Sequence, residues 1–171
     1  MATKKTTTKK SSHANRGKEF EELITSKCEE YMEQGIANIY KVPTDWTVLR
    51  KYDPVKKISI IFNAFPKEKS IVDYLGDYQG RSIALEAKKT DNKTSFPFGN
   101  VKDHQWDFMK SWKGLKFYII QFKELNKIFL VDADKFGKLK EEADRKSATY
   151  KWFEENAILL DEDIDFLKYI K

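Results

Sequence analysis

Asp73, Glu86 and Lys88 are the residues that most clearly indicate chemistry by their type and spacing. Residues 81–88 alternate as a β-strand does, so Glu86 and Lys88 point to one face and the apolar residues among them point to the other. The Gln79-Gly80 pair before this strand is typical of a two-residue hairpin turn, because glycine tolerates positive φ. Counting back from that turn places Asp73 directly opposite Glu86 on the same face.

Two carboxylates that face each other repel unless a proton or a divalent cation neutralises them. Their hard oxygen atoms suit Mg²⁺, which Mn²⁺ can replace and which needs only one or two protein carboxylates beside water and phosphate. Lys88 lies where it can orient or deprotonate an attacking water and hold a charged phosphate. These are the parts of metal-assisted phosphodiester hydrolysis. The competing interpretation is a surface hairpin whose Asp73, Glu86 and Lys88 are simply solvated.

Two further residues point towards the same site. Gln105 falls on the apolar face of a helix expected over 101–112, where a buried amide needs a partner. The carboxylate face of the sheet is one candidate, and a purely structural partner is the other. Glu21 lies at the border of the apolar stripe of a helix expected over 15–34, whereas Glu22 points away. Glu21 either reaches the same metal ion or is a solvated border residue.

The remaining pattern predicts the elements that must position these side chains. Asn15 can cap the first helix, which buries Phe20, Leu23, Ile24, Cys28 and Tyr31, and Gly35 ends it. The segment 43–70 is irregular and is expected to protrude; residues 58–62 look strand-like, but Pro54 and Pro66 flank them. We expect strands over 36–42, 71–75, 81–88, 117–122 and 128–131, with Gly76 ending the second of them. A polar loop is expected over 89–98, a last helix over 133–144, and then a short strand-poor tail. This order predicts an α/β fold, a mixed β-sheet flanked by helices, in one domain over 15–171.

Charge is unevenly distributed along the chain. The net charge of +5 includes four lysines within residues 1–14, which lack apolar periodicity and are expected to form a disordered basic tail. A second basic region lies between residues 41 and 69. Such local patches favour a nucleic-acid partner. The sequence has no apolar run long enough to span a membrane, no signal-peptide pattern and a single cysteine, so we expect an intracellular protein without an internal disulfide.

Several short motifs together point to one family. They are Asn15-Arg16-Gly17 with Glu21, Gly35-Ile36-Ala37, Lys41 with Pro43-Thr44, Asp73-Tyr74, Glu86-Ala87-Lys88, Lys93 to Pro97, His104-Gln105 and Arg145-Lys146-Ser147. In these motifs the chain resembles the RecU family of Holliday-junction resolvases, within the PD-(D/E)xK nuclease superfamily. The loop from Lys93 to Pro97, directly after Glu86-Ala87-Lys88, is the most specific of them.

The resemblance implies a restriction-endonuclease-like fold with 43–70 as a protruding stalk. It also implies a Mg²⁺-dependent homodimer that resolves four-way DNA junctions by cutting two opposed strands in recombination and repair. By position, Asp73 and Glu86 would be catalytic metal ligands, with Lys88, Gln105 and Glu21 as further catalytic residues. The DNA-binding cations would be Arg16, Arg50, Lys51, Lys56, Lys57, Lys89 and Lys93. Such a protein would be bacterial or phage-encoded, would work in the cytoplasm at the nucleoid without a membrane, and would meet recombination or branch-migration proteins.

The chain departs from the family pattern at one place, and three alternative functions remain open. The family usually has threonine just before the first aspartate, where this chain has Ile71-Val72, so any role of that hydroxyl is absent or moved. The alternatives are a related nuclease acting on ordinary duplex, a non-catalytic junction-binding protein, and an interaction module without a DNA role. The loop after Lys88 argues against a nuclease for ordinary duplex. The retention of Asp73, Glu86 and Lys88 argues against a non-catalytic binding protein, and the basic segment 43–70 argues against a module without a DNA role.

Overall fold

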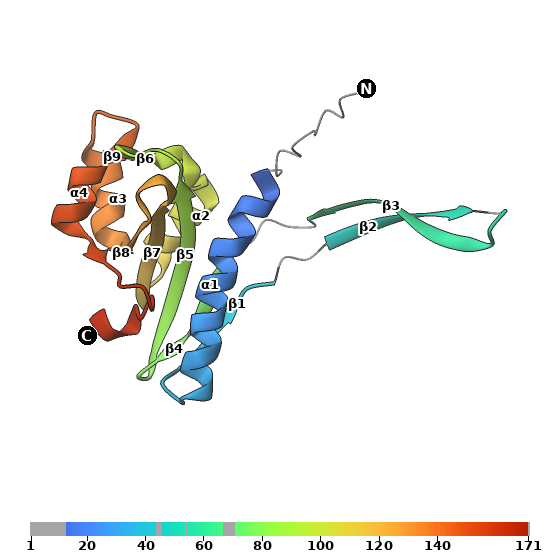
Figure 1. Cartoon of the computed structure of the whole chain (residues 1–171), viewed down its shortest axis with the longest axis horizontal. Coiled ribbons are helices and arrows are strands. Elements are labelled where there is room, and N and C mark those ends of the chain that lie inside the picture. The colour runs from blue at the N-terminus through green and yellow to red at the C-terminus, as the bar shows by residue number, and fades with distance from the viewer. Residues whose placement is uncertain (1–12, 44–45, 54, 67–70, 171) are drawn as a thin grey trace, which may run out of the picture.

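A six-stranded mixed β-sheet forms the centre of the molecule (Figure 1). The computed structural model describes residues 13–43, 46–53, 55–66 and 71–170, and within them the strand order is β1-β4-β5-β7-β8-β10. Strands β5 and β7 pair in parallel, and the other neighbours are antiparallel. The strands are β1 (Ala37–Lys41), β4 (Tyr74–Tyr78), β5 (Arg81–Thr90), β7 (Leu115–Phe122), β8 (Lys127–Asp132) and β10 (Ile158–Leu159).

Helices cover both faces of this sheet (Figure 1). On one face, α1 (His13–Glu33) and the C-terminal segment share a buried cluster with Ile83 and Leu85 of β5. On the other face lies a second cluster, rich in aromatic residues, to which α2 (Asp103–Ser111), α3 (Ala133–Glu142) and α4 (Tyr150–Asn156) contribute. Removal of these apolar side chains from water is the main force that holds the layers together. The expected α/β fold, a mixed sheet flanked by helices, is confirmed.

Helix α1 differs from expectation at its start. It begins at His13, so Asn15 lies inside the helix and the expected cap at Asn15 is wrong. The preceding Ala14 is a strong helix former, which lets the helix extend past Asn15. Leu23 is 46% exposed at the border of the apolar stripe, so its expected burial is also wrong. Gly35, with φ of +66°, follows the helix end as expected. The buried stripe consists of Phe20, Ile24, Cys28 and Tyr31.

The hairpin of β4 and β5 has the predicted turn and register. Gln79 and Gly80 both have positive φ, 54° and 72°, and Tyr78 pairs with Arg81. The predicted boundaries of the first strand, 71–75, are wrong, because β4 runs from Tyr74 to the turn. Gly76, which we read as a breaker, lies inside β4. A Cβ there would collide with the backbone carbonyl of Asn38 in β1, so glycine is needed for the two strands to approach.

The segment 43–70 is more regular than predicted. Strands β2 (Trp46–Asp53) and β3 (Ile58–Pro66) form a separate antiparallel ribbon with an irregularity between Leu49 and Arg50. The ribbon extends away from the main sheet in Figure 1. The strand-like pattern of residues 58–62 is confirmed by β3, whereas the irregularity expected for the rest of the segment is wrong. The segment does leave the main sheet, as expected.

The C-terminal third contains more structure than predicted. Strand β5 continues to Thr90 inside the expected polar loop, and β6 (Ser95–Pro97) pairs with β9 (Ser147–Thr149) in the region expected to be a tail. Short 3-10 helices also cover Phe98–Asn100, Lys123–Leu125 and Leu167–Tyr169. Helix α4 has only seven residues, too few to show a periodic pattern, yet it buries Phe153 completely. Among the described helices, none is long and apolar enough to cross a membrane.

Candidate active site

Asp73 and Glu86 meet where the chain enters β4, opposite one another across the hairpin. The backbone N–H of Asp73 donates to Glu86 Oε2 at 3.1 Å, and the backbone N–H of Ala87 donates to Asp73 Oδ2 at 2.9 Å. Glu86 is fully buried and Asp73 is partly buried. Each carboxylate therefore accepts a hydrogen bond from the backbone of the opposite side of the hairpin, so the hairpin itself holds the two acids together.

Lys88 and Gln105 complete the surroundings of Glu86. Lys88 Nζ lies 2.5 Å from Glu86 Oε1, and Gln105 Nε2 donates to the same oxygen at 2.6 Å. The side-chain oxygen of Gln105 accepts a hydrogen bond from the backbone N–H of Lys102, at the start of α2, at 3.1 Å. A helix start leaves such N–H groups without partners in the helix. The amide oxygen of Gln105 thus accepts from a free backbone N–H at the start of α2, and its amide nitrogen holds Glu86 in place.

Burial and mutual repulsion disfavour the ionised form of both carboxyls. Burial and then the charge of Asp73 raise the pKa of Glu86 from 4.5 to about 8, although Lys88 acts in the opposite direction. The pKa of Asp73 is also raised, chiefly by burial, against the opposing effects of Lys88 and the Ala87 N–H, while the charge of Glu21 adds to the rise. Lys88 alone does not compensate for burial. The pair therefore favours a bound proton or a divalent cation.

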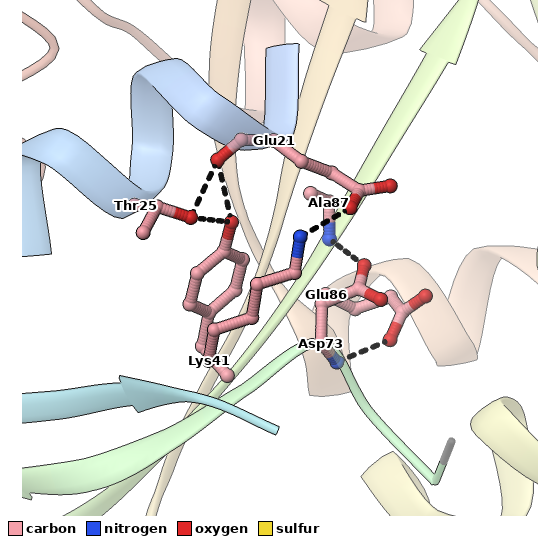
Figure 2. A network of polar contacts seen from close by, with 7 residues as sticks. Glu21, Thr25, Lys41, Asp73, Glu86 and Ala87 are labelled. Carbon is pink, nitrogen blue, oxygen red and sulfur yellow. Dashed lines mark hydrogen bonds and ion pairs between the residues drawn. The ribbon is translucent and has the colours of Figure 1, made fainter. Parts of the chain in front are cut away.

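Glu21 reaches this region from α1 but contacts a different lysine (Figure 2). Its Oε2 lies 2.7 Å from Nζ of Lys41, the last residue of β1. Its backbone carbonyl accepts hydrogen bonds from the Tyr74 hydroxyl and the Thr25 hydroxyl, each at 2.8 Å. Tyr74 is fully buried and directly follows Asp73. These contacts fasten α1 to the strand that begins at the candidate site.

The donor set of Asp73 and Glu86 suits a hard divalent cation. Both contribute carboxylate oxygens, and Mg²⁺ typically takes one or two protein carboxylates while keeping several waters. In the described residues, no group of three His, Cys, Asp or Glu side chains is placed to hold a metal ion. The carboxylate of Glu21 is paired with Lys41, and a role for Glu21 at the metal stays a prediction. The metal candidates are Asp73 and Glu86.

The predicted DNA-binding cations do not gather at this site. Lys56 and Lys57 are exposed in the turn between β2 and β3, and Lys93 is exposed between β5 and β6. Lys89 follows Lys88 on β5 and is only partly buried. The predicted tail over 1–14 falls almost wholly outside the described residues, apart from the first turn of α1. The other three predicted DNA-binding residues have side chains outside the described part of the chain. They are Arg16, Arg50 and Lys51.

Sequence reasoning missed the neighbours of Glu21. Lys41 and Tyr74 pair across β1 and β4, and Thr25 comes from α1. Their meeting depends on a strand pairing and a helix packing between segments far apart in the chain. Lys41 and Asp73-Tyr74 are present among the family-like motifs, which is the only signal in the sequence that could have drawn attention to them.

The comparisons with known proteins identify the family of the chain. A profile of the protein family RecU, described as Recombination protein U, matches residues 15–171. This chain belongs to the RecU family. RecU relatives with the name "Holliday junction resolvase RecU" include one from Bacillus cytotoxicus, which is 36% identical over 162 residues, 91% of this chain and 81% of the relative. Another, from Geobacillus sp., is 40% identical over 125 residues, 71% of this chain and 62% of the relative. A third, from Bacillus mycoides, is 35% identical over 162 residues, 91% of this chain and 81% of the relative.

Proposed function

We propose that this RecU-family chain is a Holliday junction resolvase, an endodeoxyribonuclease that cuts two opposed strands of a four-way DNA junction. The observation that carries the proposal is the buried pair of Asp73 and Glu86, with Lys88 and Gln105 both on Glu86 Oε1. A solvated surface hairpin would leave these charges exposed and free to move. The family membership supports this choice of substrate, because similar chains carry the name of junction resolvases.

Asp73 and Glu86 would hold Mg²⁺, or Mn²⁺ in its place. When bound, the ion supplies a more acidic water and positive charge for the phosphate. Lys88 would hold the phosphate charge and orient the attacking water, because its ammonium group lies beside the carboxylate pair. Gln105 would keep Glu86 in position, since its amide is fixed at both ends. We include in the proposal that Asp73, Glu86 and Lys88 form the core of a PD-(D/E)xK nuclease site.

The proposed enzyme works as a homodimer with the β2–β3 ribbon as its stalk. Cutting two symmetric strands requires two sites related by a two-fold axis, which one copy of this chain lacks. The ribbon extends away from the sheet, and Lys56 and Lys57 are exposed at its turn (Figure 1). A projecting basic ribbon favours the open centre of a junction over continuous duplex, so selectivity would come from shape rather than base contacts. Light scattering at micromolar concentration should give the mass of a dimer, and a fully active monomer contradicts this part of the proposal.

The direct test compares Mg²⁺-dependent cleavage of a synthetic four-way junction with cleavage of linear duplex made from the same arms. Wild type should cut the junction in two opposed strands, and Asp73→Asn should lose cleavage while it still binds. Asp77→Asn is the matched control, because Asp77 lies in β4, the strand that follows Asp73, is exposed, and its carboxylate accepts a hydrogen bond from the N–H of Gly80 in the hairpin turn. It should cut at the wild-type rate.

The other outcomes identify the alternatives. Cleavage of linear duplex at the same rate as the junction indicates a general nuclease. Junction binding without cleavage under Mg²⁺ or Mn²⁺ indicates a non-catalytic binding protein. Near wild-type cleavage by Asp73→Asn shows that the site lies elsewhere.

A further inference from the structure

Lys41 and Glu21 form a second acid–lysine pair beside the candidate metal residues. In the first pair, Lys88 and Glu86 are mostly buried, with 18% and 0% of their side chains exposed. In the second, Lys41 and Glu21 are 43% and 37% exposed. An ion pair this accessible contributes little to stability, because water screens it. Lys41 can therefore exchange its partner with little loss of free energy.

The backbone around this exposed pair is fixed even though its side chains are accessible. The hydroxyl of Tyr74 donates to the Glu21 carbonyl at 2.8 Å and lies 3.0 Å from the Thr25 hydroxyl, so α1 cannot move away from β4 without losing these contacts. Lys41 pairs with Tyr74 across β1 and β4, and the N–H of the next residue, Val42, donates to the carbonyl of Asp73 at 2.8 Å. The backbone of Lys41 is thus joined to the strand that follows Asp73, at the start of the connection to the ribbon, and its ammonium group contacts Glu21.

We propose that Lys41 binds a backbone phosphate of the DNA next to the cleavage site, and that Glu21 occupies Lys41 until DNA arrives. This inference rests on the proposed function. A phosphodiester carries one negative charge, as the Glu21 carboxylate does, so the phosphate can replace it on Lys41 without leaving a lone cation. The exchange also removes one carboxylate from the path of the phosphate, in a region where Asp73 and Glu86 already contribute negative charge. Glu21 then acts as a competitor for Lys41 rather than only as a ligand.

The exchange predicts opposite effects for the two partners in junction binding measured in EDTA. Lys41→Met should weaken binding about tenfold at 0.1 M salt and make the slope of log K against log salt shallower by about 0.9, the value of one phosphate contact. Lys41→Arg should restore both. Glu21→Gln should tighten binding several-fold, and this gain should vanish in the Lys41→Met background. With Mg²⁺ present, Lys41→Met should raise KM and leave kcat at saturating junction close to wild type.

The matched control is Lys27→Met, which removes the same charge and a 2.6 Å ion pair with Glu30 from the helix that carries Glu21. It should leave the salt slope unchanged. A salt slope of Lys41→Met equal to that of the control overturns the inference. So does a Glu21→Gln gain that persists without Lys41, because removal of any nearby acid would then explain it. If the wild-type chain does not bind four-way junctions, the proposed function is overturned as well. If the wild-type chain cuts junctions normally but either of the two results above is found, only the proposed role of Lys41 is refuted.

Discussion

Replacing Glu86 by glutamine should stabilise the metal-free protein at alkaline pH while it removes a metal ligand. The pKa of Glu86 is raised from 4.5 to about 8, mainly by burial. Between these two pH values the folded protein retains a proton that the unfolded chain releases. The contribution of Glu86 to stability is therefore largest below about pH 4.5, falls as the pH rises and is fully lost above about pH 8. At 1.36 kcal/mol per pH unit, the reduction has an upper limit of about 5 kcal/mol.

Glutamine keeps the shape and the acceptor oxygen of protonated Glu86 but has no proton to lose. Wild type and Glu86→Gln should thus have similar free energies of unfolding at pH 5, with the variant several kcal/mol more stable at pH 8.5. The loss of the ion pair with Lys88 keeps the gain below the upper limit. Urea unfolding in EDTA at the two pH values measures this difference. Glu124→Gln, the same change at an exposed position, should show none.

Addition of Mg²⁺ at pH 8.5 should reverse the order. The ion stabilises only a folded state that binds it, so wild type should gain stability and the variant should gain much less. If the difference between wild type and Glu86→Gln is the same at pH 5 and pH 8.5, Glu86 does not retain its proton at neutral pH. The electrostatic argument for a cation between Asp73 and Glu86 then fails.

Three further predictions test the fold and the DNA-binding regions. Gly76→Ala should lower the free energy of unfolding by about 1–3 kcal/mol in chemical denaturation, since its Cβ meets the β1 backbone, whereas Gly99→Ala, which meets no atom within 4 Å, should not. A Gly/Ser linker in place of residues 50–69 should leave the main sheet folded by circular dichroism but reduce the preference for junctions over duplex in competition binding. Deletion of residues 1–12 should flatten the salt slope by up to about 0.9 for each of its four lysines and leave α1 intact.

The parts of the site that depend on local chain geometry could be predicted from the sequence. The turn at Gln79-Gly80 determines the register of the hairpin, and strand alternation places Glu86 and Lys88 on one face, so Asp73 opposite Glu86 follows from counting. Gln105 could be assigned because a polar side chain on a buried helix face needs a partner. Each inference used contacts within one hairpin or one helix.

The parts that depend on pairing between distant segments could not be predicted. Lys41 lies beside Tyr74 only because β1 pairs with β4, and neither strand carries a signal for the other. The end of β4 was misplaced because Gly76 looks like a breaker, although its role is the close approach of two strands. Helix α4 and the pairing of β6 with β9 were missed because elements this short show no periodicity.

The order of elements along the chain ties the ribbon to the candidate active site. The chain enters the ribbon after Lys41 at the end of β1 and returns from it at Asp73, just before β4. The hydrogen bond from the Val42 N–H to the Asp73 carbonyl joins these two points at 2.8 Å. The chain therefore leaves the main sheet and returns to it beside Asp73, the first of the proposed metal ligands. If the proposed function holds, a junction bound by the ribbon is connected to Asp73 through the covalent chain itself.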